Sequence, residues 1–238
     1  MFKDKFKINN IPAVLWGEKS EIVFIAVHGN MSNKEDTVIE ILAEEAAKKG
    51  YQVLSFDLPE HGERKNYGTP CKIQFCVSDL SKVIKYVKEN WYESALFACS
   101  MGAYFSLSAY KNYKFRQALF LSPVVDMQRI IENMMKWFNV TCERLQKEQT
   151  IETPIGQKLY WDYYCYVKDN PINIWNTHTD ILYGDKDELC EADTINNFTE
   201  KYGCGLEIVE GGEHYFHTEK QLAVFRQWLQ KHINCADN

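Results

Sequence analysis

The spacing of hydrophobic residues changes in a regular way along this chain. Near-continuous runs of β-branched and aromatic residues, typical of strands buried on both faces, alternate with stretches in which apolar residues recur every three or four positions, as in amphipathic helices. The expected strands are residues 21–28, 51–58, 94–97, 117–125, 179–183 and 206–209. The expected helices are residues 32–50, 77–91, a segment that begins after residue 100, 190–202 and 219–232. This alternation predicts an α/β protein with a doubly wound, mostly parallel sheet.

The start of the chain adds two further strands. Residues 6–18 contain two short apolar runs separated by an Asn-Asn pair, which predicts a hairpin. Pro12 lacks a backbone N–H, so an edge position is expected for its strand. Ser32 and Glu35 match a capping box and are expected to begin the first helix. The hairpin brings the predicted sheet to about eight strands.

The alternation is interrupted at residues 127–177. The pattern there predicts two or three helices and no strand, with a high density of methionine and aromatic residues. We interpret this segment as a helical cap inserted after the sixth strand, with residues 1–126 and 178–238 forming the core of one structural unit. The residues expected to line a substrate pocket are Met134, Trp137, Phe138, Trp161 and Tyr164. Simple packing of the cap helices on each other remains the alternative for these residues.

Composition limits the functions that this chain can have. The 238 residues carry a net charge of −6 and no basic block, which argues against nucleic acid as a partner. No run approaches the length of a membrane span, and the first residues do not resemble a signal peptide. The eight cysteines show no Cys-x-x-Cys spacing, which favours free thiols and a cytoplasmic location. No cofactor is predicted, and no feature indicates the oligomeric state.

A serine lies where the strand over residues 94–97 turns into a helix. Such a turn lifts the Ser100 hydroxyl out of the sheet and directs the free N–H groups of the helix toward it. Small residues are needed two positions before and after the serine, and Ala98 and Gly102 occupy them. The stretch resembles the nucleophile elbow of the α/β-hydrolase superfamily, G-x-S-x-G, with alanine in place of the first glycine.

Two residues that follow other strands complete a possible catalytic triad. Because the carboxyl ends of parallel strands lie along one edge of the sheet, residues distant in sequence can meet there. Ser100, Asp187 and His214 follow their strands in the order Ser…Asp…His of this superfamily. The resemblance assigns Asp187, three residues after Gly184, as the acid, and explains Asp185 as a turn residue. It assigns His214 as the base, with His217 as the nearby rival.

The same resemblance indicates an oxyanion hole. The amide of Met101, directly after the serine, is one expected donor. The other is the amide of Asn30, because His28-Gly29-Asn30 is similar to the His-Gly loop of the family, with the His28 side chain bracing that loop. The segment over residues 57–62 resembles the D-x-P-G-H-G turn of lipase-like members. The chain is thus identified as similar to small bacterial carboxylesterases and monoglyceride lipases, acting on a small-molecule ester.

Other functions remain open on the sequence alone. A peptidase or a thioesterase would use the same triad, and a binding protein could retain the fold without the chemistry. The serine at the elbow argues against dehalogenases and epoxide hydrolases, which use aspartate there. The only candidate metal ligands are His214-x-x-His217 and Asp57…His61, and neither matches a metal-hydrolase motif, so no metal site is predicted.

Overall fold

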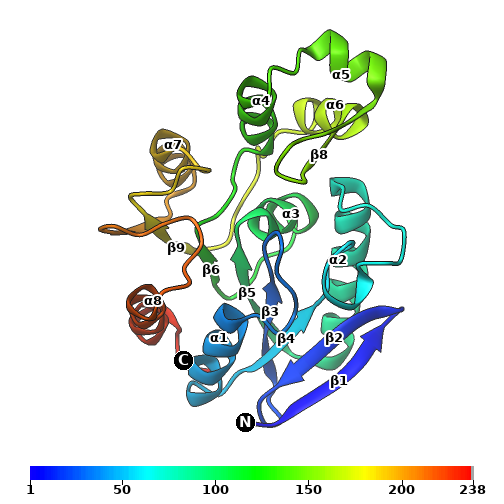
Figure 1. Ribbon diagram of the computed structural model, residues 1–238. Coiled ribbons are helices and arrows are strands. Elements are labelled where there is room, and N and C mark those ends of the chain that lie inside the picture. The colour runs from blue at the N-terminus through cyan, green and yellow to red at the C-terminus, as the bar shows by residue number, and fades with distance from the viewer. Residues whose placement is uncertain (237–238) are drawn as a thin grey trace.

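A single large sheet forms the centre of the computed structural model, which describes residues 1–236 (Figure 1). Within those residues the sheet has eight strands in the order β1-β2-β4-β3-β5-β6-β9-β10. The strands are β1 (Lys3–Ile8), β2 (Ile11–Trp16), β3 (Ile22–Val27), β4 (Gln52–Phe56), β5 (Glu93–Cys99), β6 (Ala118–Leu121), β9 (Thr179–Gly184) and β10 (Gly205–Val209). All neighbours from β4 to β10 pair in parallel, and β2 is antiparallel to both β1 and β4. The predicted fold class is confirmed.

Helices cover both faces of this sheet. Residues of β3 alternate between two hydrophobic clusters, with Val23 and Ile25 on one face and Phe24 and Ala26 on the other. The helices that contribute to the first cluster are α2 (Ile73–Asn90), α3 (Met101–Ala109) and α7 (Ala192–Tyr202). Those that contribute to the second are α1 (Thr37–Lys48) and α8 (Glu219–His232). This two-sided burial explains why the parallel strands are apolar at consecutive positions.

Two local expectations near the start of the chain are wrong. Pro12 belongs to β2, which has partners on both sides, and β1 is the edge strand. Proline is tolerated there because pairing with β4 begins only at Ala13, and the Pro12 carbonyl still accepts a hydrogen bond from the Asp57 amide at 3.0 Å. The predicted hairpin itself is present, with β1 and β2 joined by a turn at residues 9 and 10.

The first helix begins later than the capping box predicts. Its N-cap is Asp36, and the Ser32 hydroxyl donates to the Asp36 carboxylate instead of receiving a helix amide. The Glu35 carboxylate pairs with Lys3 at 2.5 Å and with Lys5 at 2.8 Å, both on β1. Ion pairs with a strand distant in sequence therefore determine the position of Glu35, and local capping does not.

Residues 127–177 form a lobe beyond α3 (Figure 1). Its elements are α4 (Met127–Trp137), α5 (Cys142–Glu148), β7 (Thr150–Glu152), β8 (Lys158–Tyr160) and α6 (Trp161–Asp169). The expectation of no strand here is wrong, because β7 and β8 pair as an antiparallel hairpin. Ile151 and Leu159, opposite each other in this hairpin, are both buried in the hydrophobic cluster that continues into the lobe from one face of the sheet.

The helices of the described residues include none that is both long and apolar enough to cross a lipid bilayer. All eight cysteines lie within the described range and each carries a free thiol.

The aromatic core beneath the central strand provides a test of this packing. Phe97 on β5 is fully buried, and its ring lies 5.8 Å from that of Phe225 on α8. We expect Phe97→Ala to lower the free energy of unfolding by about 4 kcal/mol, because it removes buried surface and leaves a cavity. Phe75→Ala is the matched control, since that side chain on α2 is 43% exposed, and it should change stability by less than about 0.5 kcal/mol. Urea denaturation measures both, and equal losses would contradict the packing described here.

Candidate active site

Ser100 lies in a sharp turn between β5 and α3. Its backbone has φ 52° and ψ −126°, a conformation that side-chain-bearing residues rarely adopt. Gly102 follows in the first turn of α3, where a Cβ atom would lie 2.5 Å from the His28 carbonyl oxygen and 2.6 Å from that of Val27. Only glycine therefore lets α3 begin so close to the end of β3. Ala98, in place of the first family glycine, fits in a fully buried position on β5.

The three side chains assigned to the triad form a continuous hydrogen-bonded chain. The Ser100 hydroxyl lies 2.8 Å from His214 Nε2, and His214 Nδ1 lies 2.7 Å from a carboxylate oxygen of Asp187. The carboxylate accepts the Nδ1 proton, which leaves the lone pair of Nε2 directed at the serine. The Asp187 side chain is fully buried, while that of His214 is 20% exposed. Ser100 therefore has a base within reach, and the base has an orienting acid.

The two candidate acids have different partners. The second carboxylate oxygen of Asp187 accepts the amides of Leu189 at 2.9 Å and Cys190 at 2.8 Å. These bonds stabilise a buried negative charge and hold the carboxylate toward the histidine. The Asp185 carboxylate accepts the Gly211 amide at 2.7 Å and joins the loops after β9 and β10. The geometry thus favours Asp187 as the partner of the histidine.

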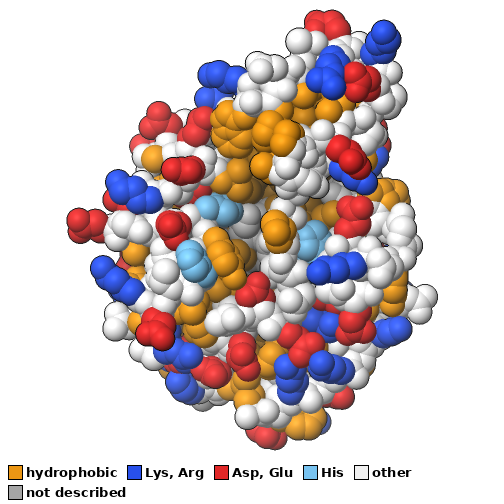
Figure 2. All heavy atoms as spheres, viewed as in Figure 1, with side chains coloured by type: hydrophobic (Ala, Val, Ile, Leu, Met, Phe, Trp, Pro, Cys, Tyr) orange, Lys and Arg blue, Asp and Glu red, His pale blue; other side chains and the backbone are white. Residues whose placement is uncertain are grey.

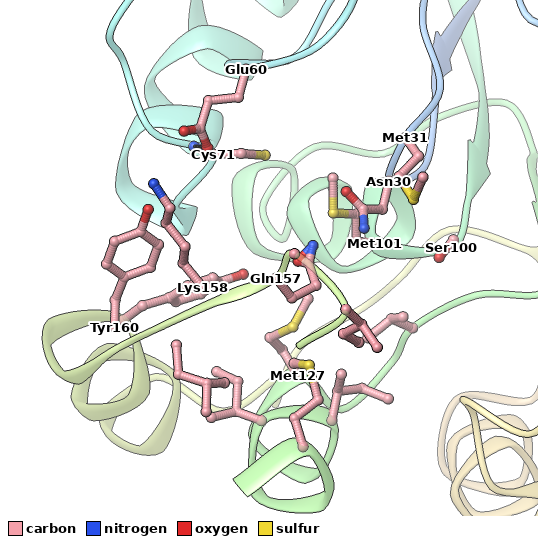
Figure 3. Close-up of a pocket in the computed structure, with 18 of the residues that line it drawn as sticks. Asn30, Met31, Glu60, Cys71, Ser100, Met101, Met127, Gln157, Lys158 and Tyr160 are labelled. Carbon is pink, nitrogen blue, oxygen red and sulfur yellow. Dashed lines mark hydrogen bonds between the residues drawn. The ribbon is translucent and has the colours of Figure 1, made fainter. Parts of the chain in front are cut away.

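The amides assigned to the oxyanion hole lie beside the serine. Met101 is the first residue of α3, so its N–H has no partner inside the helix. Asn30 belongs to the loop after β3, and a Cβ atom on the preceding Gly29 would lie 3.0 Å from Ser100 Cβ. In the part of the chain that is described, neither amide donates a hydrogen bond to the protein. Figure 3 shows both residues close to Ser100.

His28 holds this loop in place. Its Nδ1 donates to the Gly29 carbonyl at 2.7 Å, and its Nε2 accepts the amide of Leu58 at 3.0 Å. The side chain thereby joins the loop after β3 to the loop after β4. Complete burial lowers the pKa of His28 to about 4, with the nearby His61 adding to the shift and the Gly29 carbonyl opposing it. A neutral ring is what these two hydrogen bonds require.

A cavity of about 650 Å³ opens from Ser100 toward the lobe. Figure 2 shows the surface hollowed between the lobe and the rest of the molecule, with hydrophobic side chains gathered on the lobe. Of the residues predicted to line a pocket, Met134 and Trp137 are on the wall, whereas Phe138, Trp161 and Tyr164 are not among the lining residues. Tyr164 instead donates to Glu132 at 3.0 Å, and the Trp161 ring lies 6.0 Å from that of Tyr164.

Several lining residues were not expected from the sequence. From the core they include Met31, Glu60, His61, Lys65, Cys71 and Phe105. From the lobe they include Met127, Ile130, Ile131, Ile155, Gln157, Lys158, Leu159, Tyr160 and Tyr163. The β7–β8 hairpin supplies much of the second group, and the Pro154 and Gly156 turn between its strands is a signal that could have revealed it. The far end of the cavity is consequently polar (Figure 3).

Two further groups near the triad are explained without a catalytic role. Asp187, Cys190 and His214 place potential metal-ligand atoms within 4.8 Å of one another, the one such group of three found in the described residues. Burial raises the pKa of the Cys190 thiol, however, so the thiolate that a metal needs is disfavoured. His217 is half exposed, lies 2.8 Å from the Tyr215 carbonyl oxygen and does not line the cavity.

Comparisons with known proteins agree with this geometry. A family model described as serine aminopeptidase, S33, matches residues 18–174. The solved structure of Est1E from Butyrivibrio proteoclasticus with bound ferulic acid is similar over 96% of both chains, with 18% identity and a TM-score of 0.78. A putative hydrolase from Agrobacterium vitis S4 covers 97% of this chain and 98% of its own, with 16% identity and a TM-score of 0.79. An esterase from Pyrococcus furiosus covers 97% and 88%, with 18% identity and a TM-score of 0.66. No match was found among curated protein sequences.

The buried state of His28 predicts how stability depends on pH. Its folded-state pKa of about 4 lies below the ordinary value of 6.5, so between these values only the unfolded chain binds the proton. Stability is therefore lost as the pH falls, by about 2 kcal/mol from this residue between pH 7 and pH 5. We expect urea denaturation of His28→Gln at the two pH values to lack this component. If the variant and the original chain lose equal stability, His28 is not the neutral brace described here.

Proposed function

The chain belongs to the serine aminopeptidase S33 family of α/β-hydrolases, and from that premise we propose that it is a serine hydrolase that cleaves a carboxylic ester of a small or medium-sized molecule. The observation that carries the proposal is the hydrogen-bonded chain from Ser100 through His214 to Asp187. Such a chain activates a hydroxyl that is otherwise a weak nucleophile. The cytoplasmic location expected from the free cysteines is part of the same proposal.

The reaction follows from the positions of these groups. Ser100 Oγ attacks the ester carbonyl while His214 Nε2 accepts its proton, and the imidazolium then donates this proton to the departing alcohol. Asp187 keeps Nδ1 protonated and stabilises the charged ring. A water molecule, deprotonated by His214, then attacks the acyl-enzyme and releases the acid. The partial exposure of His214 leaves a path by which that water reaches the ring.

Charge that develops on the carbonyl oxygen is met by the amides of Asn30 and Met101. Both belong to segments fixed by buried contacts, Asn30 through the His28 brace and Met101 through the close approach of α3 to β3. Donors that are already oriented need little reorganisation as the charge develops, which makes their electrostatic stabilisation large. The N-terminus of α3 adds its dipole at the same position.

The cavity indicates which part of the substrate carries the acyl group. Its volume of about 650 Å³ suits a small molecule. Near the serine its wall is formed by flexible methionine side chains, chiefly Met31, Met101, Met127 and Met134. Thioethers adapt to varied apolar shapes, including aromatic rings. We therefore propose a short or medium acyl chain, or an aromatic acid, as the acyl group.

A peptidase or thioesterase that uses the same triad is the second candidate. The feature that favours a peptidase is the carboxylate of Glu60 on the cavity wall, because an anionic group there could bind a free amino terminus. The same carboxylate accepts the Cys71 amide at 2.7 Å and so has a structural partner as well. Activity on matched p-nitrophenyl esters, thioesters and amino-acid p-nitroanilides separates the candidates, with esters expected to have the highest kcat/KM.

The triad assignment predicts a specific order of mutational effects. Ser100→Ala should lower kcat on an ester by roughly 10³- to 10⁶-fold, because it removes the nucleophile. Asp187→Asn should lower kcat by about 10⁴-fold, because the amide favours the wrong histidine tautomer. Asp185→Asn is the matched control and should change kcat by less than about tenfold, since Asp185 contacts only a backbone amide. A severe loss in Asp185→Asn beside a mild loss in Asp187→Asn would reject this assignment.

Labelling by a fluorophosphonate probe addresses the non-catalytic alternative. Probe attachment that is lost in Ser100→Ala indicates an activated serine. A chain that is folded but takes up no probe would support a binding protein on this fold.

The cavity wall predicts which substitutions change substrate preference. Met134→Ala enlarges the cavity, so we expect the optimum of a p-nitrophenyl ester series to move toward longer acyl chains. Trp161→Ala is the control from the same lobe, because its ring packs against Tyr164 outside the cavity. Its effect should be on stability, with the chain-length profile unchanged. The reverse result would show that the lobe closes on the substrate by a different face.

A further inference from the structure

Two cysteines lie together at the end of the cavity that is distant from Ser100. Cys71 belongs to the loop before α2 and lines the cavity, and Cys76 is fully buried in the first turns of that helix. Their sulfur atoms are 3.7 Å apart, within hydrogen-bonding distance for thiols. Figure 3 shows the Cys71 sulfur pointing from its loop toward the interior of the cavity. This arrangement differs from that of an isolated structural thiol.

The surroundings of Cys71 stabilise its thiolate. The hydrogen bond from the Cys76 thiol is the largest influence, and the ring of His61 adds to it against the effect of burial, so that the pKa of Cys71 is lowered to about 6. Burial raises the pKa of Cys76, and the Cys71 thiolate adds to that shift, so Cys76 remains a protonated donor. A thiolate beside a neutral thiol is the arrangement of a reactive cysteine with a resolving partner.

A buried hydroxyl points to the same place. Tyr163 on α6 lines the cavity, and its phenolic oxygen is buried with no hydrogen-bond partner among the residues that the structure describes. Burial raises the pKa of Tyr163, and the charges of Cys76 and Cys71 add to this rise, so the phenol stays protonated near the two sulfurs. A neutral donor without a partner can serve a sulfur atom or an oxygen bound to it.

From this cluster we propose that Cys71 and Cys76 form a second reactive site of the protein, in which a hydroperoxide oxidises Cys71 and the resulting sulfenic acid closes a disulfide with Cys76. Nothing in the ester chemistry at Ser100 uses these thiols, so the proposal stands independently of the hydrolase assignment.

The reaction balances in two steps. The Cys71 thiolate attacks one oxygen of the hydroperoxide, so that an S–O bond forms, the O–O bond breaks and the alkoxide or hydroxide leaves with a proton as alcohol or water. The Cys76 sulfur then attacks the Cys71 sulfur, so that an S–S bond forms and the S–O bond breaks. Hydroxide departs with the Cys76 proton as water. The thiol pair loses two electrons, and the hydroperoxide gains them.

A contact path joins this site to the proposed oxyanion hole. His61 Nε2 lies 3.2 Å from the side-chain oxygen of Asn30, and the same ring acts on Cys71. Oxidation removes the Cys71 thiolate, and with it the negative charge that favours a charged His61. If the hydrolase proposal is also correct, oxidation should lower kcat on esters through this path. The thiol chemistry is measured without any ester, so failure of one proposal is distinguishable from failure of the other.

The chain offers a convenient chemical readout, because Lys72 lies between the two cysteines. Trypsin releases Cys71 in the peptide 66–72 and Cys76 in the peptide 73–82. After treatment with hydrogen peroxide and alkylation of the remaining thiols, we expect mass spectrometry to find these peptides joined by a disulfide. In Cys76→Ser the reaction should stop at the sulfenic acid on Cys71, trapped by dimedone. Cys71→Ser should give neither product, and Cys142→Ser, which removes an exposed cysteine, should behave as the original chain.

A second measurement needs no variant. We expect the rate of iodoacetamide alkylation at Cys71 to fall only about twofold from pH 8 to pH 6, because its thiolate is lost only near pH 6, whereas an ordinary thiol slows roughly a hundredfold. The ionisable groups that act on Cys71, Cys76 and Tyr163 are Glu60, His61, Arg64, Asp79, Tyr104 and Tyr160. Cys142 in the same sample supplies the ordinary profile. The proposal is overturned if peroxide leaves both peptides unlinked while exposed cysteines oxidise, or if Cys71 and Cys142 share one pH profile.

Discussion

The close contact between the start of α3 and the end of β3 is the constraint on which the site depends. At Gly102 the helix backbone approaches the carbonyl oxygens of Val27 and His28 so closely that no side chain fits. This contact forces the strained turn at Ser100 and brings the loop after β3 against the nucleophile. The serine, the helix N-terminus and the second oxyanion donor therefore arise from one packing requirement. The sheet behind them, buried on both faces, supplies the rigidity that sustains the strain.

Two histidines near this contact illustrate how surroundings determine roles. His28 is completely buried between two backbone groups, which keeps it neutral and makes it a connector of loops. His214 lies at the opening of the cavity between a hydroxyl and a buried carboxylate, which is the position of a base. The Asp187 charge is itself held by backbone amides, so the histidine is oriented by a group that cannot easily move.

The lobe gives the cavity two ends of different chemistry. Near the serine, methionines of both the core and the lobe provide an adaptable apolar wall. At the opposite end, the loop before α2 and the β7–β8 hairpin bring polar, charged and sulfur-containing side chains together. His61 lies between the two ends and contacts both Asn30 and the Cys71 region. A polar end linked in this way to the oxyanion loop is a feature of the tertiary structure alone.

The sequence by itself determined the parallel α/β core, because buried strands and amphipathic helices have distinct periods that a single chain reveals. It also indicated the triad and the two oxyanion residues, since residues after parallel strands share one edge and the elbow requires small neighbours. Only the tertiary structure decided that Glu35 pairs with β1, that Trp161 and Tyr164 pack within the lobe, and that Cys71 meets Cys76 and His61 in the cavity wall. Apolar periodicity identifies which side of a helix is buried but not against what, and ion pairs between distant elements leave no local pattern. The lobe hairpin was missed for a related reason, because strands of three residues are too short to display a period.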